Sequence, residues 1–177
     1  MKIFNRHEIE IAANEAEIGR LIDTLASPND LLWPHFRWPK MHFDKPLSVG
    51  ARGGHGPIGY SVEEYEPGKR VLFRFENTHW VSRGIEGYHT LFMEHGTGGT
   101  RLVHEITGTI EGRALMIWPL AIRPLHDALV EDALARAAKH FDAAYPFPPR
   151  LSLWVRVLRF TLMRGRSRSA RYQQTAS

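Results

Sequence analysis

The periodicity of the apolar residues changes once along this chain, near Gly112, and this change limits the possible folds more than any other feature. Before it, apolar and polar side chains alternate in several segments, as in strands with one buried face. After it, apolar side chains recur every three to four residues over one long segment, as on a helix that buries one face. The sequence therefore predicts an antiparallel sheet followed by a single long helix.

The predicted strands are alternating segments separated by turn sequences. They cover residues 7–11, 58–62, 71–76, 83–94 and 100–110. The last is the clearest, because Leu102, His104 and Ile106 share one face. Between two of the strands, the sequence EPGK at 66–69 has proline and glycine at its centre, which suits a type II turn. Strands with one solvated face are typical of antiparallel meanders.

Two short helices are expected after the first strand. Asn14 stands three residues before Glu17, the spacing of a capping box. The sequence SPND at 27–30 offers a second helix start, with proline at the first helical position. Residues 33–56 hold many prolines and glycines, so most of this stretch is expected to be irregular. In the long C-terminal helix, Pro119 and Pro124 are expected to interrupt or kink the start.

These elements predict an α+β fold in which a curved antiparallel sheet wraps around the long C-terminal helix. The sheet and the helix each have one apolar face, and packing them together buries both. A curved sheet and a straight helix do not touch along their full length. The gap between them is expected to form a pocket.

Several segments resemble the SRPBCC superfamily, which includes START lipid-transfer domains, birch-allergen-like proteins and polyketide cyclases. The segments are GGHG at 53–56, EPGKRV at 66–71, GGTRL at 98–102 and RPLHDAL at 123–129, within a resemblance that covers about residues 3–143. It implies the helix-grip fold and a ligand cavity. It implies no particular reaction, because catalysts and passive carriers share this scaffold.

Six side chains are candidates for binding a ligand in such a cavity: His55, Tyr60, His89, His104, Trp118 and His126. The alternation places His104 on the inner face of its strand, and His126 lies in the apolar stripe of the helix. Each imidazole could be a core residue satisfied by its neighbours, a hydrogen-bonding partner of a ligand, or a group that transfers protons. The same alternation places Glu105 on the outside of the sheet.

The sequence predicts no metal site and no cofactor. His89, His104 and His126 are too far apart in the sequence to define a metal geometry, and no HExxH-type pair is present. Nucleophile-elbow, P-loop and dinucleotide-binding motifs are also absent. The catalytic residues, if there are any, therefore remain unassigned.

The positive charge of the chain is confined to its C-terminal part. The net charge is +4, but residues 146–177 hold seven arginines and no acidic residue, so residues 1–145 carry about −3. We expect a helix-grip domain over 1–145 and a proline-rich linker with a basic amphipathic segment over 146–177. Residues 150–171 could dock on the domain or on a second subunit, or they could contact an anionic membrane surface. Binding of nucleic acid is a third alternative, and it is disfavoured because no groove-reading motif accompanies the arginines.

The function that the sequence favours is binding or carriage of a small, largely apolar molecule, such as a lipid, polyketide or isoprenoid. A cyclase, dehydratase or hydrolase that uses a pocket histidine as general acid or base is one alternative, and an interaction scaffold that acts through the basic tail is another. With no cysteine, no signal peptide and no membrane span, we expect a cytoplasmic protein, with contact at the inner face of the membrane as an option for the tail. The oligomeric state is left open.

Overall fold

The computed structural model describes residues 1–77 and 79–161. Its centre is one antiparallel sheet of seven strands in the order β1-β7-β6-β5-β4-β3-β2. The strands are β1 (Lys2–Ile11), β2 (His42–Phe43), β3 (Arg52–His55), β4 (Ile58–Glu66), β5 (Arg70–Glu76), β6 (Ile85–His95) and β7 (Thr100–Ile110). The first strand pairs with the last, so the chain has returned to its starting edge when the long helix begins.

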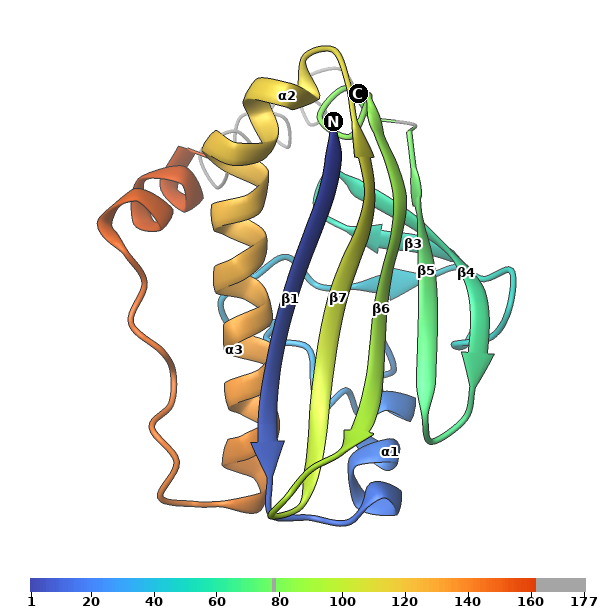
Figure 1. Ribbon diagram of the computed structural model, residues 1–177, viewed down its shortest axis with the longest axis vertical. Coiled ribbons are helices and arrows are strands. Elements are labelled where there is room, and N and C mark those ends of the chain that lie inside the picture. Colours follow the sequence, from blue (N-terminus) through green and yellow to red (C-terminus); the bar gives the residue numbers. More distant parts are fainter. Residues whose placement is uncertain (78, 162–177) are drawn as a thin grey trace, which may run out of the picture.

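The long helix α3 (Arg123–Phe141) runs alongside β1 (Figure 1). It follows a short helix α2 (Ala114–Ile117) and a π-helical turn η1 (Trp118–Ile122). The interruption predicted at Pro119 and Pro124 takes the form of this π turn, since a proline cannot supply its own backbone N–H to the helix. The predicted helix-grip fold, a curved sheet around a long C-terminal helix, is confirmed.

The capping box predicted at Asn14 is present and begins α1 (Glu15–Asp23). At the other end of this helix, the Asp23 carboxylate accepts hydrogen bonds from the Tyr65 hydroxyl and the Gly68 backbone N–H, both at 2.8 Å. Gly68 has a φ of 71°, which the predicted type II turn requires at this position. One carboxylate therefore fixes α1 to the turn between β4 and β5.

The prediction of a second short helix, after Ser27, is wrong. Residues 24–38 form turns and bends, in which the Asp30 carboxylate accepts the backbone N–H groups of Ala26, Leu32 and Trp33. Pro34 disfavours a helical conformation of the residue before it, so the capped turn at Asp30 does not continue as a helix.

The stretch predicted to be irregular also contains two strands, β2 and β3, which extend the sheet beyond β4. Their close pairing depends on Gly53, because a Cβ at this position would lie 2.0 Å from the backbone oxygen of His42. His55 ends β3, so it belongs to the sheet and not to a free turn.

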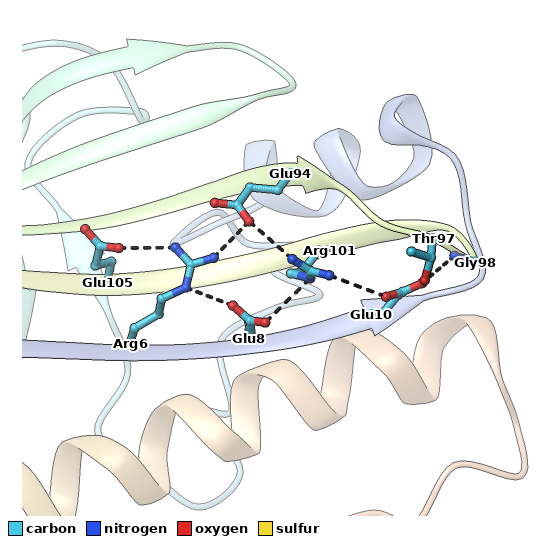
Figure 2. Close-up of polar contacts among 8 residues, drawn as sticks. All are labelled: Arg6, Glu8, Glu10, Glu94, Thr97, Gly98, Arg101 and Glu105. Carbon is cyan, nitrogen blue, oxygen red and sulfur yellow. Dashed lines mark hydrogen bonds and ion pairs between the residues drawn. The ribbon is translucent and has the colours of Figure 1, made fainter.

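The outer face of β1, β7 and β6 carries a network of charged side chains (Figure 2). The Arg6 guanidinium contacts Glu8 and Glu94 at 2.8 Å and Glu105 at 3.3 Å. Arg101 lies further along the same face, within 4 Å of Glu8, Glu10 and Glu94. Glu105 therefore points outward, as the alternation predicts, and contributes nothing to the interior.

The side of α3 that faces away from the sheet is also covered. Asp132 is 0% exposed, and its carboxylate accepts hydrogen bonds from Trp38 Nε1 at 2.6 Å and Arg37 Nη1 at 2.9 Å. Burial raises the pKa of Asp132, against the lowering effect of these partners. The carboxylate therefore ties the loop after α1 to the back of the helix.

The first part of the basic tail packs against the same region. Residues 153–161 are helical, Val155 is 5% exposed, and Trp154 Nε1 donates a hydrogen bond to the backbone oxygen of Leu120 at 2.8 Å. The Arg159 guanidinium lies 4.9 Å from the centre of the Trp38 ring. The structure thus shows docking on the domain for this part. The predictions for Leu162, Arg164, Arg166, Arg168 and Arg171 lie outside the described residues.

None of the helices described in residues 1–77 and 79–161 has both the length and the hydropathy needed to span a bilayer.

Replacing Asp132 with alanine is expected to lower the free energy of unfolding by about 3 kcal/mol, because the buried N–H of Trp38 and the charge of Arg37 lose their partner. Urea denaturation measures this loss. Glu131→Ala, at an exposed position on the same helix, is the control and should change the value by less than about 0.5 kcal/mol. A similar small effect of both substitutions would contradict a structural role for Asp132.

Candidate functional site

A cavity of about 320 Å³ lies between the inner face of the sheet, the η1–α3 region and the tail helix. Its walls are mainly apolar and include Ile85, Ile106, Trp118, Ile122, Leu125 and Leu129. Leu158 and Thr161 of the tail helix contribute to the wall as well. The gap expected between a curved sheet and a straight helix is therefore present.

A second, smaller cavity of about 40 Å³ lies deeper in the interior. Five polar side chains line it together with aliphatic ones, namely His55, Tyr60, His89, His104 and His126. His55, Tyr60, His126 and Leu129 line both cavities. The polar groups that the larger cavity can use therefore sit where the two cavities adjoin.

These five side chains form a row of ring contacts, in which His55, Tyr60, His89 and His104 come from the sheet and His126 comes from α3. His104 on β7 is the cross-strand partner of His7 on β1. On its other side, His104 pairs with Leu91 of β6, and His89 lies two residues before Leu91 on the same face. His89 is 5% exposed and stacks on Phe73 of β5, with ring centres 4.6 Å apart. His89 therefore faces the interior.

Only some members of the row are joined by hydrogen bonds. The Tyr60 hydroxyl lies 2.6 Å from His55 Nε2, and His89 Nδ1 lies 3.3 Å from His104 Nε2. The other contacts are between rings, with centre-to-centre distances of 4.2 Å for Tyr60 and His89 and 4.9 Å for His104 and His126. Within residues 1–77 and 79–161, three buried imidazole nitrogens have no hydrogen-bond partner: His89 Nε2, His104 Nδ1 and His126 Nδ1.

Burial keeps the histidines of this row uncharged. It lowers the pKa of His55 to about 3, with a smaller contribution from His126. It also lowers the pKa values of His89 and His104 well below the usual 6.5, and that of His126 to a lesser extent because Asp127 opposes the shift. Burial raises the pKa of the Tyr60 hydroxyl. At neutral pH the row therefore offers neutral donors and acceptors.

The end of the row nearest β1 holds three residues that the sequence analysis did not select. His7 Nε2 and Asn5 Nδ2 lie 3.1 Å and 3.0 Å from Asp127 Oδ1. Burial raises the pKa of Asp127, but the nearby imidazoles of His126 and His7 outweigh it and lower the pKa overall. A signal for His7 did exist, since it shares the inner face of the first strand with Ile9 and Ile11. In the sequence, Asp127 lies opposite the apolar stripe of the helix, where no contact with the sheet is expected.

The six predicted site residues are thus all close to the interior but not equivalent. His55, Tyr60, Trp118 and His126 line the larger cavity, whereas His89 and His104 line only the smaller one. Their roles in binding stay predictions.

Comparison with solved structures shows which class of fold this arrangement belongs to. A point mutant of norcoclaurine synthase from Thalictrum flavum, in complex with a transition-state analogue, is similar with a TM-score of 0.58 and 15% identity, over 79% of this chain and 96% of that one. CalU16 from Micromonospora echinospora is similar with a TM-score of 0.53 and 15% identity, over 91% and 83% of the two chains. The di-domain ARO/CYC protein StfQ of the steffimycin biosynthetic pathway is similar with a TM-score of 0.55 and 12% identity, over 80% of this chain and 50% of StfQ.

These similarities show the fold alone, and they confirm the helix-grip fold that the resemblance to the SRPBCC superfamily implies. No protein-family model matches the sequence, and a comparison with curated proteins finds no match either. The reaction or ligand has to be argued from the cavity itself, because identities this low relate folds and not functions.

The free energy of unfolding is expected to fall as the pH drops below about 6.5, because the unfolded chain then takes up protons at histidines that the folded protein keeps neutral. The stability is fully present above this pH and is lost below it. Each such histidine adds a slope of up to about 1.4 kcal/mol per pH unit. His89→Phe keeps the aromatic stack and should make the slope shallower by up to that amount.

Urea denaturation between about pH 7 and pH 5 measures this slope. His95→Phe, at an exposed position of the same strand, is the control and should leave it unchanged. An unchanged slope in His89→Phe would mean that His89 is not held neutral by burial.

Proposed function

We propose that the protein binds a small, largely apolar molecule in the 320 Å³ cavity. The observation that carries this proposal is an apolar cavity between sheet and helix with a few polar groups at one end. Its volume is at the lower end of the range of about 300–1,000 Å³ that is usual for small-molecule sites. A compact ligand such as a small polyketide or isoprenoid fits this size better than a long lipid.

The polar end favours a ligand with a hydroxyl or carbonyl group over a charged one. The imidazoles of His55 and His126 are neutral at pH 7, and a charged group in this cavity would be desolvated without a counter-ion. A neutral hydroxyl or carbonyl can exchange hydrogen bonds with the Tyr60 hydroxyl or an imidazole nitrogen. His126 lines this cavity and can supply one such donor or acceptor.

Catalysis at the same site is the alternative. StfQ is an ARO/CYC protein and norcoclaurine synthase is an enzyme by its name, so the scaffold accommodates reactions. A cyclase, dehydratase or hydrolase would need one of the buried histidines to move a proton. Because burial disfavours the charged imidazolium, carriage agrees better with the site than proton transfer through His89 or His104 does.

Native mass spectrometry of protein purified gently from its own host tests the proposal most directly. A carrier should retain a ligand of defined mass, and incubation should leave that mass unchanged. A new mass that appears with time would favour the catalytic alternative. An empty protein that also fails to bind apolar probes would contradict both.

Ala121→Trp is expected to block the cavity, because Ala121 lies in its wall and the indole would occupy the space of the ligand. Titration with the uncharged fluorescent apolar probe N-phenyl-1-naphthylamine should show a Kd at least about tenfold higher than that of the wild type, equivalent to about 1.4 kcal/mol. Ala144→Trp, at an exposed position, is the matched control and should bind like the wild type. Equal probe binding by Ala121→Trp and the wild type would place the binding site elsewhere.

A second function, contact with an anionic membrane surface, is favoured by the exposed side of the tail helix. Apolar side chains on this helix and on the neighbouring α2–η1 segment are exposed: Leu115, Met116, Leu120, Leu153, Trp154 and Val157. Arg150 and Arg156 are exposed beside them. Apolar side chains with arginines nearby are what a helix needs to lie in the membrane interface.

Replacing Leu153 and Val157 together with glutamate should abolish such contact, since it removes apolar area and adds negative charge. Co-sedimentation with phosphatidylserine-containing vesicles measures the effect, and phosphatidylcholine vesicles should bind the wild type more weakly. Val49→Glu, at an exposed apolar position in another part of the molecule, is the control. If the double variant sediments as well as the wild type does, the tail helix is not the contact surface.

A further inference from the structure

Three potential metal ligands from distant parts of the chain meet where β1 passes the beginning of α3. Each of His7, His126 and Asp127 offers one ligand atom, and these atoms all lie within 4.8 Å of one another. Asp127 Oδ1 is 3.1 Å from His7 Nε2 and 3.7 Å from His126 Nδ1. In the described part of the chain, no other group of three such side chains meets this criterion.

Two buried atoms at this place lack the partners that buried polar atoms normally have. His126 Nδ1 has no hydrogen-bond partner, although it points to the side where Asp127 lies. Asn5 is 6% exposed, and its Oδ1 is also without a partner, while its Nδ2 donates to Asp127 Oδ1 at 3.0 Å. The His126 nitrogen is one of the three converging ligand atoms and has a lone pair that a cation can use, and the Asn5 oxygen belongs to the amide that contacts Asp127.

We propose that His7, His126 and Asp127 bind a divalent transition-metal ion, with zinc as the best fit. Two imidazoles and one carboxylate are ligands that Zn²⁺ accepts, with bond lengths of about 2.0–2.2 Å. Ligand atoms around a tetrahedral ion of this size are about 3.4 Å apart. The distances of 3.1 Å and 3.7 Å lie on either side of that value, and the His7 and His126 atoms lie within 4.8 Å of each other. Side-chain rotations that bring the two imidazoles closer together would complete the site.

The surroundings support an ion at this position. Asn5 holds the carboxylate in place through its amide, as partners behind metal ligands commonly do. Arg123, on the same helix, forms an ion pair with Asp127, with its Nε 3.7 Å from Asp127 Oδ2. Because the Arg123 side chain is half-exposed, it can move into solvent when a metal ion binds. Three protein ligands leave a coordination position for water, as in zinc sites that are not fully closed.

The proposed metal site is distinct from the ligand cavity but shares one residue with it. His126 lines both cavities, whereas His7 and Asp127 line neither. The sequence predicted no metal site, and the ligand set weighed there was His89, His104 and His126. The sheet register and the helix instead bring His7 and Asp127 to it.

Untagged full-length protein, stripped of metal with a chelator and dialysed, is titrated with Co²⁺ and followed by visible absorption, and with Zn²⁺ by calorimetry. We expect one equivalent of each ion to bind, with the visible bands of four- or five-coordinate cobalt. His7→Ala and Asp127→Asn should each raise the Kd at least about tenfold, because one of three ligands is lost. His95→Ala, which removes an exposed histidine at the other end of the sheet, should bind like the wild type.

Nuclear magnetic resonance of the wild type provides a test that does not depend on the folding of variants. Addition of Zn²⁺ should shift the imidazole resonances of His7 and His126 and leave those of His79 and His95 unchanged. No Co²⁺ binding up to about millimolar concentration, or shifts confined to the exposed histidines, would overturn the proposal. Binding of N-phenyl-1-naphthylamine should survive His7→Ala, so loss of the metal site and failure of the ligand cavity are distinguishable.

Discussion

A curved sheet and a straight helix can touch only along part of their length, and the interior of this protein is organised around that mismatch. The buried apolar residues form two separate clusters. One gathers around Ile106, Ile110 and Trp118, and the other around Phe73, Leu102 and Leu134. The larger cavity has wall residues from both clusters, including Trp118 from the first and Leu129 from the second. The cavity is therefore the space that neither cluster fills, and it follows from the shape of the fold and not from a missing side chain.

Such a space persists only if the helix is prevented from moving into it. On its outer side, α3 is held by Asp132, which accepts hydrogen bonds from Trp38 and Arg37. Arg136 of the same helix also donates hydrogen bonds to the backbone oxygens of Trp33 and Asp30. The tail helix adds Val155 to the core and Arg159 over the Trp38 ring. Because this contact fixes the position of α3 from behind, the sheet-facing side can remain incompletely packed. The same contact explains why α3 has buried residues on two sides, including Ala135 and Asp132.

The strands, the first helix and the long helix could be predicted from the sequence because their signals are local. Alternation places Leu102, His104 and Ile106 correctly, and the Asn14 capping box begins α1. The pairing of β2 with β3 could not be predicted, since it depends on the approach of Gly53 to the backbone of His42. At the candidate site, the same alternation was enough to predict inward-facing histidines. Asn5 and Asp127 were not, because β1 covers the flank of α3 that a single-faced helix would leave in solvent, and only the tertiary structure brings these two residues together.

A row of neutral imidazoles inside an apolar core costs stability, since each buried nitrogen without a partner has lost its hydrogen bonds to water. Leucine or phenylalanine would pack the inner face of β6 and β7 without that cost. The presence of the polar atoms is explained if they bind a ligand. We propose two such ligands, a small apolar molecule in the cavity and a metal ion beside it. Near the cavity, Tyr60, His55 and His126 suit a neutral hydroxyl or carbonyl, whereas Asp127 brings a negative charge to the other end, where only a cation is suited. His126 belongs to both groups. If both occupants bind, their affinities must be coupled through this one imidazole, and by linkage each would change the affinity of the other by the same factor.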